Sequence, residues 1–118
     1  MRHHNVVRKF GRKTGVRRAF MRSLAKNLIE NGKITTTEAR AKELRPYIEK
    51  MITIGRGATP ASRGVLTSKL GGGVVFVKKL VEEVSPKFKD TRGGYTRIVK
   101  LGKRLGDASP MAIIEFVK

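Results

Sequence analysis

Apolar side chains recur at helical spacing near the start of the chain. Between residues 14 and 31 they repeat every three or four positions, at Phe20, Met21, Leu24, Ala25, Leu28 and Ile29. This stripe predicts an amphipathic helix that buries one face. Thr14 can serve as its N-cap. Asn31-Gly32 predicts its end, because glycine adopts the left-handed conformation without a Cβ penalty.

A second helix is predicted within "KITTTEARAKELRPYIEKMITIG" at 33–55, after a short β-branched strand at 33–36. The threonines at 35–37 can cap it, and Thr35-x-x-Glu38 has the spacing of a capping box. Its apolar positions form one face and are Ala41, Leu44, Ile48, Met51 and Ile52. Pro46 lacks an amide donor and is expected to kink the helix. Acidic and basic residues balance here, so we expect this helix to have a structural role.

Two further helical segments are predicted in the middle of the chain. Thr59-Pro60 has the pattern of an N-cap and a first-turn proline, and a short helix from there reaches to about Leu70. The next segment carries apolar residues at helical spacing, at Val77, Leu80, Val81 and Val84. Its valine content also suits a strand. Pro86 is expected to end it.

The last third of the chain changes to an alternating pattern, which is typical of strands. In "GGYTRIVKLG", Tyr95, Arg97, Val99 and Leu101 share one face, and Thr96, Ile98 and Lys100 share the other. "MAIIEFVK" predicts a second strand with Ala112, Ile114 and Phe116 on one side, and the turn-rich "GKRLGDASP" connects the two. This is an antiparallel hairpin, to which residues 34–36 can add an edge strand.

Together these elements predict an α+β fold, in which a small helical layer packs on a short sheet based on an antiparallel hairpin. Residues 1–14 do not fit that layer, because they are basic, contain Gly11 and hold few apolar side chains. We therefore expect a basic extended N-terminal arm over residues 1–14 and a single α+β domain over residues 15–118.

Net charge indicates the kind of partner. The chain has 27 Lys and Arg against 9 Asp and Glu, a formal charge of +18. Self-repulsion at this density opposes compaction, so a polyanion is expected as partner, and nucleic acid fits best. No stretch approaches the roughly 20 apolar residues of a membrane span. The first residues lack the apolar run of a signal peptide, so we expect a cytoplasmic protein without a membrane partner.

The arm and the first helix share a run of cations in which no acid occurs before Glu30. A solubilising tail is the alternative for the arm, but such tails are usually rich in Ser, Glu or Pro. Most protein contacts to nucleic acid go to phosphate and sugar, and Arg and Lys supply many of them. We therefore predict RNA binding by Arg2, His3, Arg8, Lys9, Arg12, Lys13, Arg17, Arg18, Arg22 and Lys26.

A second cluster of predicted RNA-binding residues lies around the hairpin: Arg92, Tyr95, Thr96, Arg97, Lys100, Lys103 and Arg104. Gly93-Gly94 would allow the backbone to approach a phosphate closely. The side chains of Tyr95 and Thr96 would then reach sugar hydroxyls or an unpaired base. A core position for Tyr95 is the alternative.

No catalytic or metal-binding constellation is visible in the sequence. His3-His4 has no acid nearby, and the chain has no cysteine. Glu82 and Glu83 are neighbours that would point about 100° apart on a helix. Without a metal-holding acidic cluster or a paired base, we predict no enzyme activity, no metal, no cofactor and no small-molecule substrate.

The hairpin "GGYTRIVKLGKRLGDASPMAIIEFVK" resembles the C-terminus of the bacterial large-subunit ribosomal protein family numbered seventeen. The resemblance continues through Met1-Arg2-His3, Arg8-Lys9-x-x-Arg12, Arg17, Arg22 and "ITTTEARAKELR" at 34–45, so it covers essentially the whole chain. It implies a small α+β protein that binds large-subunit ribosomal RNA near the outer end of the peptide exit tunnel. Neighbouring ribosomal proteins are the other partners that it implies, with no catalysis. Gly71-Gly72-Gly73 departs from the family pattern.

The resemblance makes a structural ribosomal protein the main hypothesis. An architectural nucleic-acid-binding protein of the nucleoid is the alternative, since composition alone fits it equally well. Such proteins usually dimerise or insert an apolar wedge, and the sequence shows no obvious wedge loop.

Overall fold

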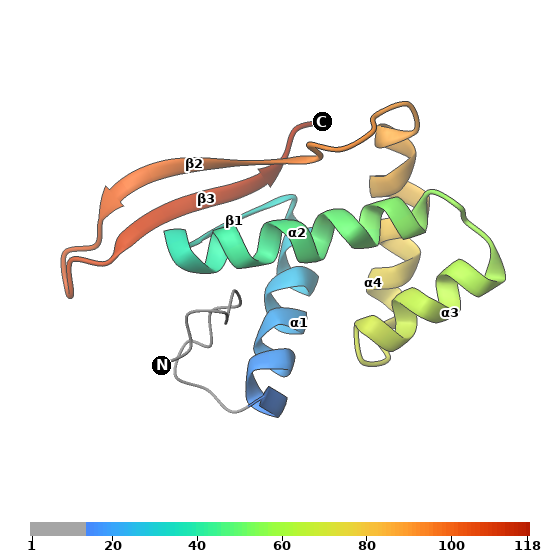
Figure 1. Cartoon of the computed structure of the whole chain (residues 1–118), viewed down its shortest axis with the longest axis horizontal. Helices are drawn as coiled ribbons and strands as arrows, with labels where there is room; N and C mark the ends of the chain where they lie inside the picture. Colours follow the sequence, from blue (N-terminus) through green and yellow to red (C-terminus); the bar gives the residue numbers. More distant parts are fainter. Residues whose placement is uncertain (1–13) are drawn as a thin grey trace, which may run out of the picture.

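Helix α2 (Glu38–Gly55) lies at the centre of the fold, and the sheet and neighbouring helices pack against it (Figure 1). The computed structural model describes residues 14–118. All five apolar positions predicted for this helix are buried. The helix runs through Pro46. The fold is α+β, as the sequence predicts.

The capping box predicted at the start of α2 is wrong. Thr37 is the N-cap, and its Oγ1 accepts a hydrogen bond of 3.3 Å from the backbone amide of Arg40. Thr35 lies inside strand β1 (Lys33–Thr37), opposite Ile113, and the strand continues through Thr37, the residue that directly precedes the helix. A run of three threonines gives several possible caps, and strand pairing decides which one is used.

The sheet has three antiparallel strands in the order β1-β3-β2, with β2 at Thr96–Lys103 and β3 at Pro110–Phe116. The predicted hairpin and the predicted edge strand are therefore confirmed. Leu101 is an extra residue in β2, since Lys100 pairs with Ala112 and Gly102 with Met111. The hairpin extends past the start of α2, so its tip stands away from the helices (Figure 1).

One face of the sheet packs on α2, and the other is open. Thr36, Thr96, Ala112 and Ile114 are buried on the packed face. The predicted grouping of Tyr95 with the residues at 97, 99 and 101 is wrong. Tyr95 is buried although Arg97, Val99 and Leu101 are exposed, because it precedes β2 and follows Gly94, whose φ of 67° redirects the chain.

The remaining helices flank α2. They are α1 (Thr14–Asn31), α3 (Pro60–Lys69) and α4 (Val74–Lys79). A π-helical turn (Leu80–Val84) and a 3-10 turn (Ser85–Phe88) continue α4. The segment is helical and not a strand, and its four predicted apolar positions are buried. The chain does not leave its helical path at Pro86, because proline is tolerated in the first turn of a helix.

Candidate nucleic-acid interface

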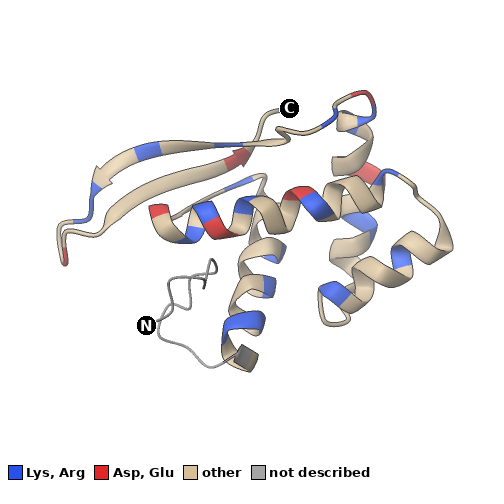
Figure 2. Ribbon diagram, in the orientation of Figure 1, with Lys and Arg blue, Asp and Glu red and all other residues tan. Residues whose placement is uncertain are grey.

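Helix α1 carries four cations, Arg17, Arg18, Arg22 and Lys26, which we call the α1 basic face. Residues 18, 22 and 26 are each four positions apart and therefore lie along one side of the helix. Glu30, in the last turn, is the sole acid between residues 14 and 31. Figure 2 shows Lys and Arg following one another along this helix. The stripe borders the buried side of α1, because Ala25 and Ile29 are three and seven positions after Arg22 and are both buried. Arg22 and Lys26 are accordingly only half-exposed.

The cations of the α1 basic face are held by different contacts. Arg22 is half-buried, and its Nε donates a hydrogen bond of 3.1 Å to the carbonyl oxygen of Lys69. Lys26 Nζ lies 5.7 Å from the centre of the Phe76 ring. The Arg18 side chain is exposed. None of these contacts neutralises a charge, so the positive charge of the face remains available to an anion.

Arg40 is a further cation beside α1 that the sequence analysis missed. It comes from α2, and its guanidinium lies 4.7 Å from the centre of the Phe20 ring. Guanidinium groups stack well on aromatic faces. No local pattern reveals this contact, because its two residues belong to different helices.

The cations of the hairpin are arranged differently, since three of them form ion pairs. Arg97 pairs with Glu115 at 3.2 Å, Lys100 with Glu38 at 3.4 Å, and Arg104 with Asp107 at 2.6 Å. Hydrogen bonds from Lys42 and Lys100 lower the pKa of Glu38 below its usual value. Within residues 14–118, no carboxylate pairs with the exposed Arg92 and Lys103.

The RNA-binding role predicted for the Tyr95 side chain does not fit the structure. Tyr95 is 2% exposed, and its ring packs edge-on against Phe88 with centroids 5.1 Å apart. Its hydroxyl lies 3.1 Å from Thr53 Oγ1 and accepts a hydrogen bond of 2.6 Å from Arg56. The alternative, a core aromatic, is the correct reading.

Thr96 is also buried, so its side chain does not belong to the predicted interface. It is 1% exposed, and both its amide and its hydroxyl donate to Glu49 Oε2, at 3.1 and 3.0 Å. The alternation of β2 places it on the face that packs against α2. These corrections leave Arg92, Arg97, Lys100, Lys103 and Arg104 as the surface cations of the predicted hairpin cluster.

The other predicted RNA-binding residues are Arg2, His3, Arg8, Lys9, Arg12 and Lys13, which lie outside the described residues. The structure therefore brings together the four cations of α1 and separates them from those of the hairpin. Helix α2 stands between the two groups (Figure 2).

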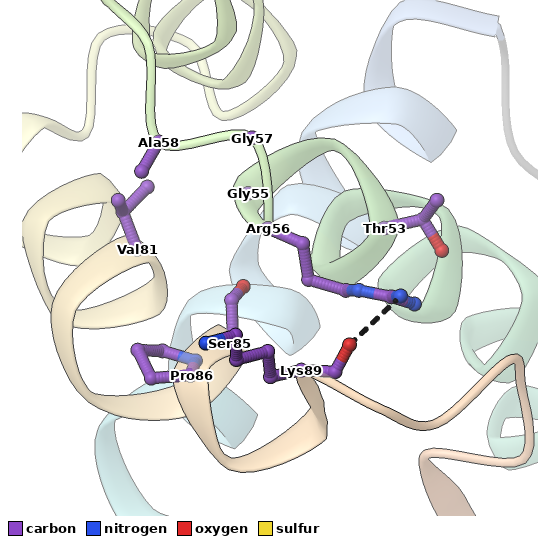
Figure 3. A pocket seen from close by; sticks show the side chains of 9 residues that line it. All are labelled: Thr53, Gly55, Arg56, Gly57, Ala58, Val81, Ser85, Pro86 and Lys89. Atoms are coloured by element: carbon purple, nitrogen blue, oxygen red, sulfur yellow. Dashed lines mark hydrogen bonds between the residues drawn. The ribbon is translucent and has the colours of Figure 1, made fainter.

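A cleft of about 530 Å³ lies where α2 turns into α3, beside the end of the π-helical turn. Its side chains include Arg56, Val81, Ser85 and Lys89 (Figure 3). The lining contains no Asp, Glu or His. The Ser85 hydroxyl donates to the carbonyl oxygen of Ile52 at 3.2 Å, and Arg56 donates to that of Lys89 at 3.1 Å. The Ser85 hydroxyl is therefore engaged with the backbone, and no carboxylate or imidazole of the lining is available to activate it.

Over residues 14–118, no group of three or more His, Cys, Asp or Glu side chains could hold a metal ion. No helix in the same range has the length and apolar character needed to cross a membrane.

Comparison with known proteins identifies the family. The model of the family described as "Ribosomal protein L17" matches residues 20–117. A protein named "Large ribosomal subunit protein bL17" from Nautilia profundicola is 48% identical, over 99% of this chain and 98% of its own length. The protein of the same name from Thermoanaerobacter sp. strain X514 is 54% identical, over 93% and 97%. That from Desulfitobacterium hafniense is 50% identical, over 95% and 99%. The chain belongs to the ribosomal protein L17 family.

Proposed function

We propose that this protein is a structural constituent of the large ribosomal subunit and binds and stabilises large-subunit ribosomal RNA near the peptide exit tunnel. It acts in the cytoplasm, within the ribosome, without catalysis and without a cofactor. The names of its relatives support the ribosomal role. The resemblance of its motifs supports the location.

The α1 basic face is the observation that carries RNA binding. Within residues 14–118 no ion pair involves these cations, and they follow directly on the five cations at residues 2, 8, 9, 12 and 13. Each phosphate neutralised by such a cation releases counterions, which drives binding. The three ion-paired cations of the hairpin are less favourable binding sites for phosphate, because RNA would have to compete with a carboxylate for each of them.

Neighbouring ribosomal proteins are proposed to contact the open sheet face, which we define as Lys33, Thr35, Arg97, Val99, Met111, Ile113 and Glu115. These residues form rows across the strands, with Lys33 and Arg97 flanking Glu115, and Thr35 and Val99 flanking Ile113. Val99 is 44% exposed. The face has two cations and one acid and no aromatic ring, so it offers RNA little charge and no stacking surface. Exposed aliphatic side chains instead favour a protein surface.

Salt dependence of RNA binding tests the main proposal. The wild-type protein should bind purified bacterial large-subunit ribosomal RNA with an affinity that falls steeply as salt increases. Arg18→Gln should lower the log–log slope by roughly 0.7 to 0.9, the contribution of one phosphate contact. Lys50→Gln is the matched control, because it removes an exposed cation of α2 and should leave the slope nearly unchanged. A wild-type slope near zero would contradict RNA binding by charge.

Density-gradient fractionation of a lysate separates this proposal from the nucleoid alternative. The ribosomal constituent should migrate with large subunits through a high-salt wash. Migration with DNA, and its loss after DNase treatment, would instead support the architectural protein.

A further inference from the structure

The carbonyl oxygen of Lys69, at the end of α3, accepts two hydrogen bonds from two other helices. The hydroxyl of Tyr47 in α2 donates at 3.0 Å, and Nε of Arg22 in α1 donates at 3.1 Å. A single oxygen atom thus joins three helices at the α1 basic face. The Arg22 side chain is fixed at its guanidinium end and not only along its stem.

The turn after α3 is shaped to admit the same side chain. Gly71 has φ of 64°, and a Cβ built on it would lie 3.2 Å from Nη1 of Arg22. A Cβ on Gly73 would lie 3.0 Å from Cε of Lys26. Both distances are shorter than ordinary van der Waals contact between heavy atoms. The glycines of this turn therefore leave room for two successive cations of α1.

This arrangement leaves most of the Arg22 guanidinium able to bind a ligand. Arginine has five N–H donors, and the bond to Lys69 uses the one on Nε. Burial raises the pKa of Tyr47 above its usual value, against the opposing effects of the Arg22 charge, a hydrogen bond with Arg22 and the Arg18 charge. The hydroxyl is therefore protonated near neutral pH and can donate its bond. A side chain already fixed in place loses less conformational freedom when it binds.

We propose that Tyr47 and the Gly71–Gly73 turn are positioning elements, which hold Arg22 and Lys26 in place to bind phosphates of the ribosomal RNA. The inference rests on the proposed function, because it concerns the same interface. It gives a role to the Gly-Gly-Gly sequence and to a tyrosine of a helix that the sequence analysis treated as structural. Neither Tyr47 nor the glycines need to contact RNA themselves.

A double-mutant cycle tests whether Tyr47 acts through Arg22. Affinity for purified bacterial large-subunit ribosomal RNA is measured for wild type, Tyr47→Phe, Arg22→Ala and the double variant, well below their melting temperatures. Tyr47→Phe should weaken binding about 2- to 10-fold, the range expected for one hydrogen bond. In the Arg22→Ala background the same change should have almost no effect.

The glycine turn provides a matched pair of variants. Gly71→Ala and Gly72→Ala both place a side chain at positive φ, 64° and 91°. A Cβ at Gly72 meets no heavy atom within 4 Å, whereas one at Gly71 meets Arg22. Both variants should lose stability, but only Gly71→Ala should also weaken RNA binding and reduce its salt slope. Circular dichroism melts establish that each variant is folded at the assay temperature.

The possible outcomes separate this inference from the proposed function. If Tyr47→Phe leaves RNA affinity unchanged, or weakens it equally with and without Arg22, the positioning role is wrong. It is also wrong if Arg22→Ala has no effect, or if the Gly71 and Gly72 variants lose affinity alike. The proposed function depends instead on steep, salt-dependent binding by the wild-type protein, which all of these outcomes leave unaffected.

Discussion

Arg56 donates a hydrogen bond of 2.6 Å to the hydroxyl of Tyr95, 39 residues further along the chain. The same Nη1 donates to the carbonyl oxygen of Thr91 at 2.6 Å, and Nη2 donates to that of Lys89. Arg56 directly follows the last residue of α2, where a cation is favoured by the helix dipole. One guanidinium thus fastens the end of the central helix to the segment that leads into the hairpin.

Tyr95→Phe should therefore destabilise the fold without changing RNA binding. The substitution removes the hydrogen bonds of the hydroxyl to Arg56 and Thr53, while Arg56 keeps its bonds to Thr91 and Lys89. The expected cost is therefore about 0.5 to 1.5 kcal/mol, the net contribution of a typical hydrogen bond. Urea unfolding should give a lower midpoint with an unchanged slope, and RNA affinity should match wild type below the transition. Tyr47→Phe is the contrasting variant, since it is expected to affect RNA affinity. A Tyr95→Phe protein with normal stability and weakened RNA binding would contradict the buried position.

Two helical glycines should respond in opposite directions to alanine. At Gly55 a Cβ would lie 2.5 Å from Ser85 Oγ, and that hydroxyl is buried and bonded to the carbonyl of Ile52. At Gly64, inside α3, a Cβ meets no heavy atom within 4 Å. Gly55→Ala should lower stability, whereas Gly64→Ala should raise it by up to about 1 kcal/mol, because alanine favours helices. Thermal unfolding of both variants checks this, and equal shifts would show that Ser85 moves freely.

The tip of the hairpin should keep its structure to unusually low pH. A hydrogen bond from Arg104, with further bonds from Ser109, holds the pKa of Asp107 well below its usual 3.8. The pKa of this carboxylate is lower in the folded state than in the unfolded state. Its contribution to folding stability is therefore complete at a pH above its unfolded-state pKa and is lost only as the pH falls through its folded-state pKa. Carbon-detected NMR should find the Asp107 midpoint well below 3.8. Arg104→Gln should raise it toward the usual value, while Arg97→Gln should not move it.

Most of the fold could be predicted from the sequence because its signals are local. Four-residue spacing located α1 and the buried face of α2, and Thr59-Pro60 located the start of α3. Alternation predicted both strands of the hairpin. The start of α2 was assigned to the wrong threonine, because β1 continues through Thr37 and its length depends on pairing with β3, far along the chain.

Side-chain partners at the candidate site could not be predicted in this way. Tyr95 looks like a surface aromatic next to two glycines until Thr53 and Arg56 are placed beside its hydroxyl. The role of Gly71 likewise depends on the position of Arg22 in another helix. The charge of α1 was visible in the sequence, but its separation from the ion-paired cations of the hairpin required the structure.

The open sheet face and the α1 basic face should contact different kinds of molecule in the ribosome. A photo-reactive amino acid in place of Val99 should crosslink to a neighbouring ribosomal protein in assembled large subunits, because aliphatic residues surround that position. The same probe in place of Ala19, exposed between Arg18 and Arg22, should crosslink to ribosomal RNA. Neither side chain packs in the core, so both variants should fold and enter subunits. Nuclease digestion followed by mass spectrometry identifies each product.

If the Val99 probe yields RNA, a second copy of this chain or its own residues 1–13, the face does not bind a protein neighbour. If it yields no product while the Ala19 probe reacts with RNA, that assignment fails and RNA binding by α1 stands.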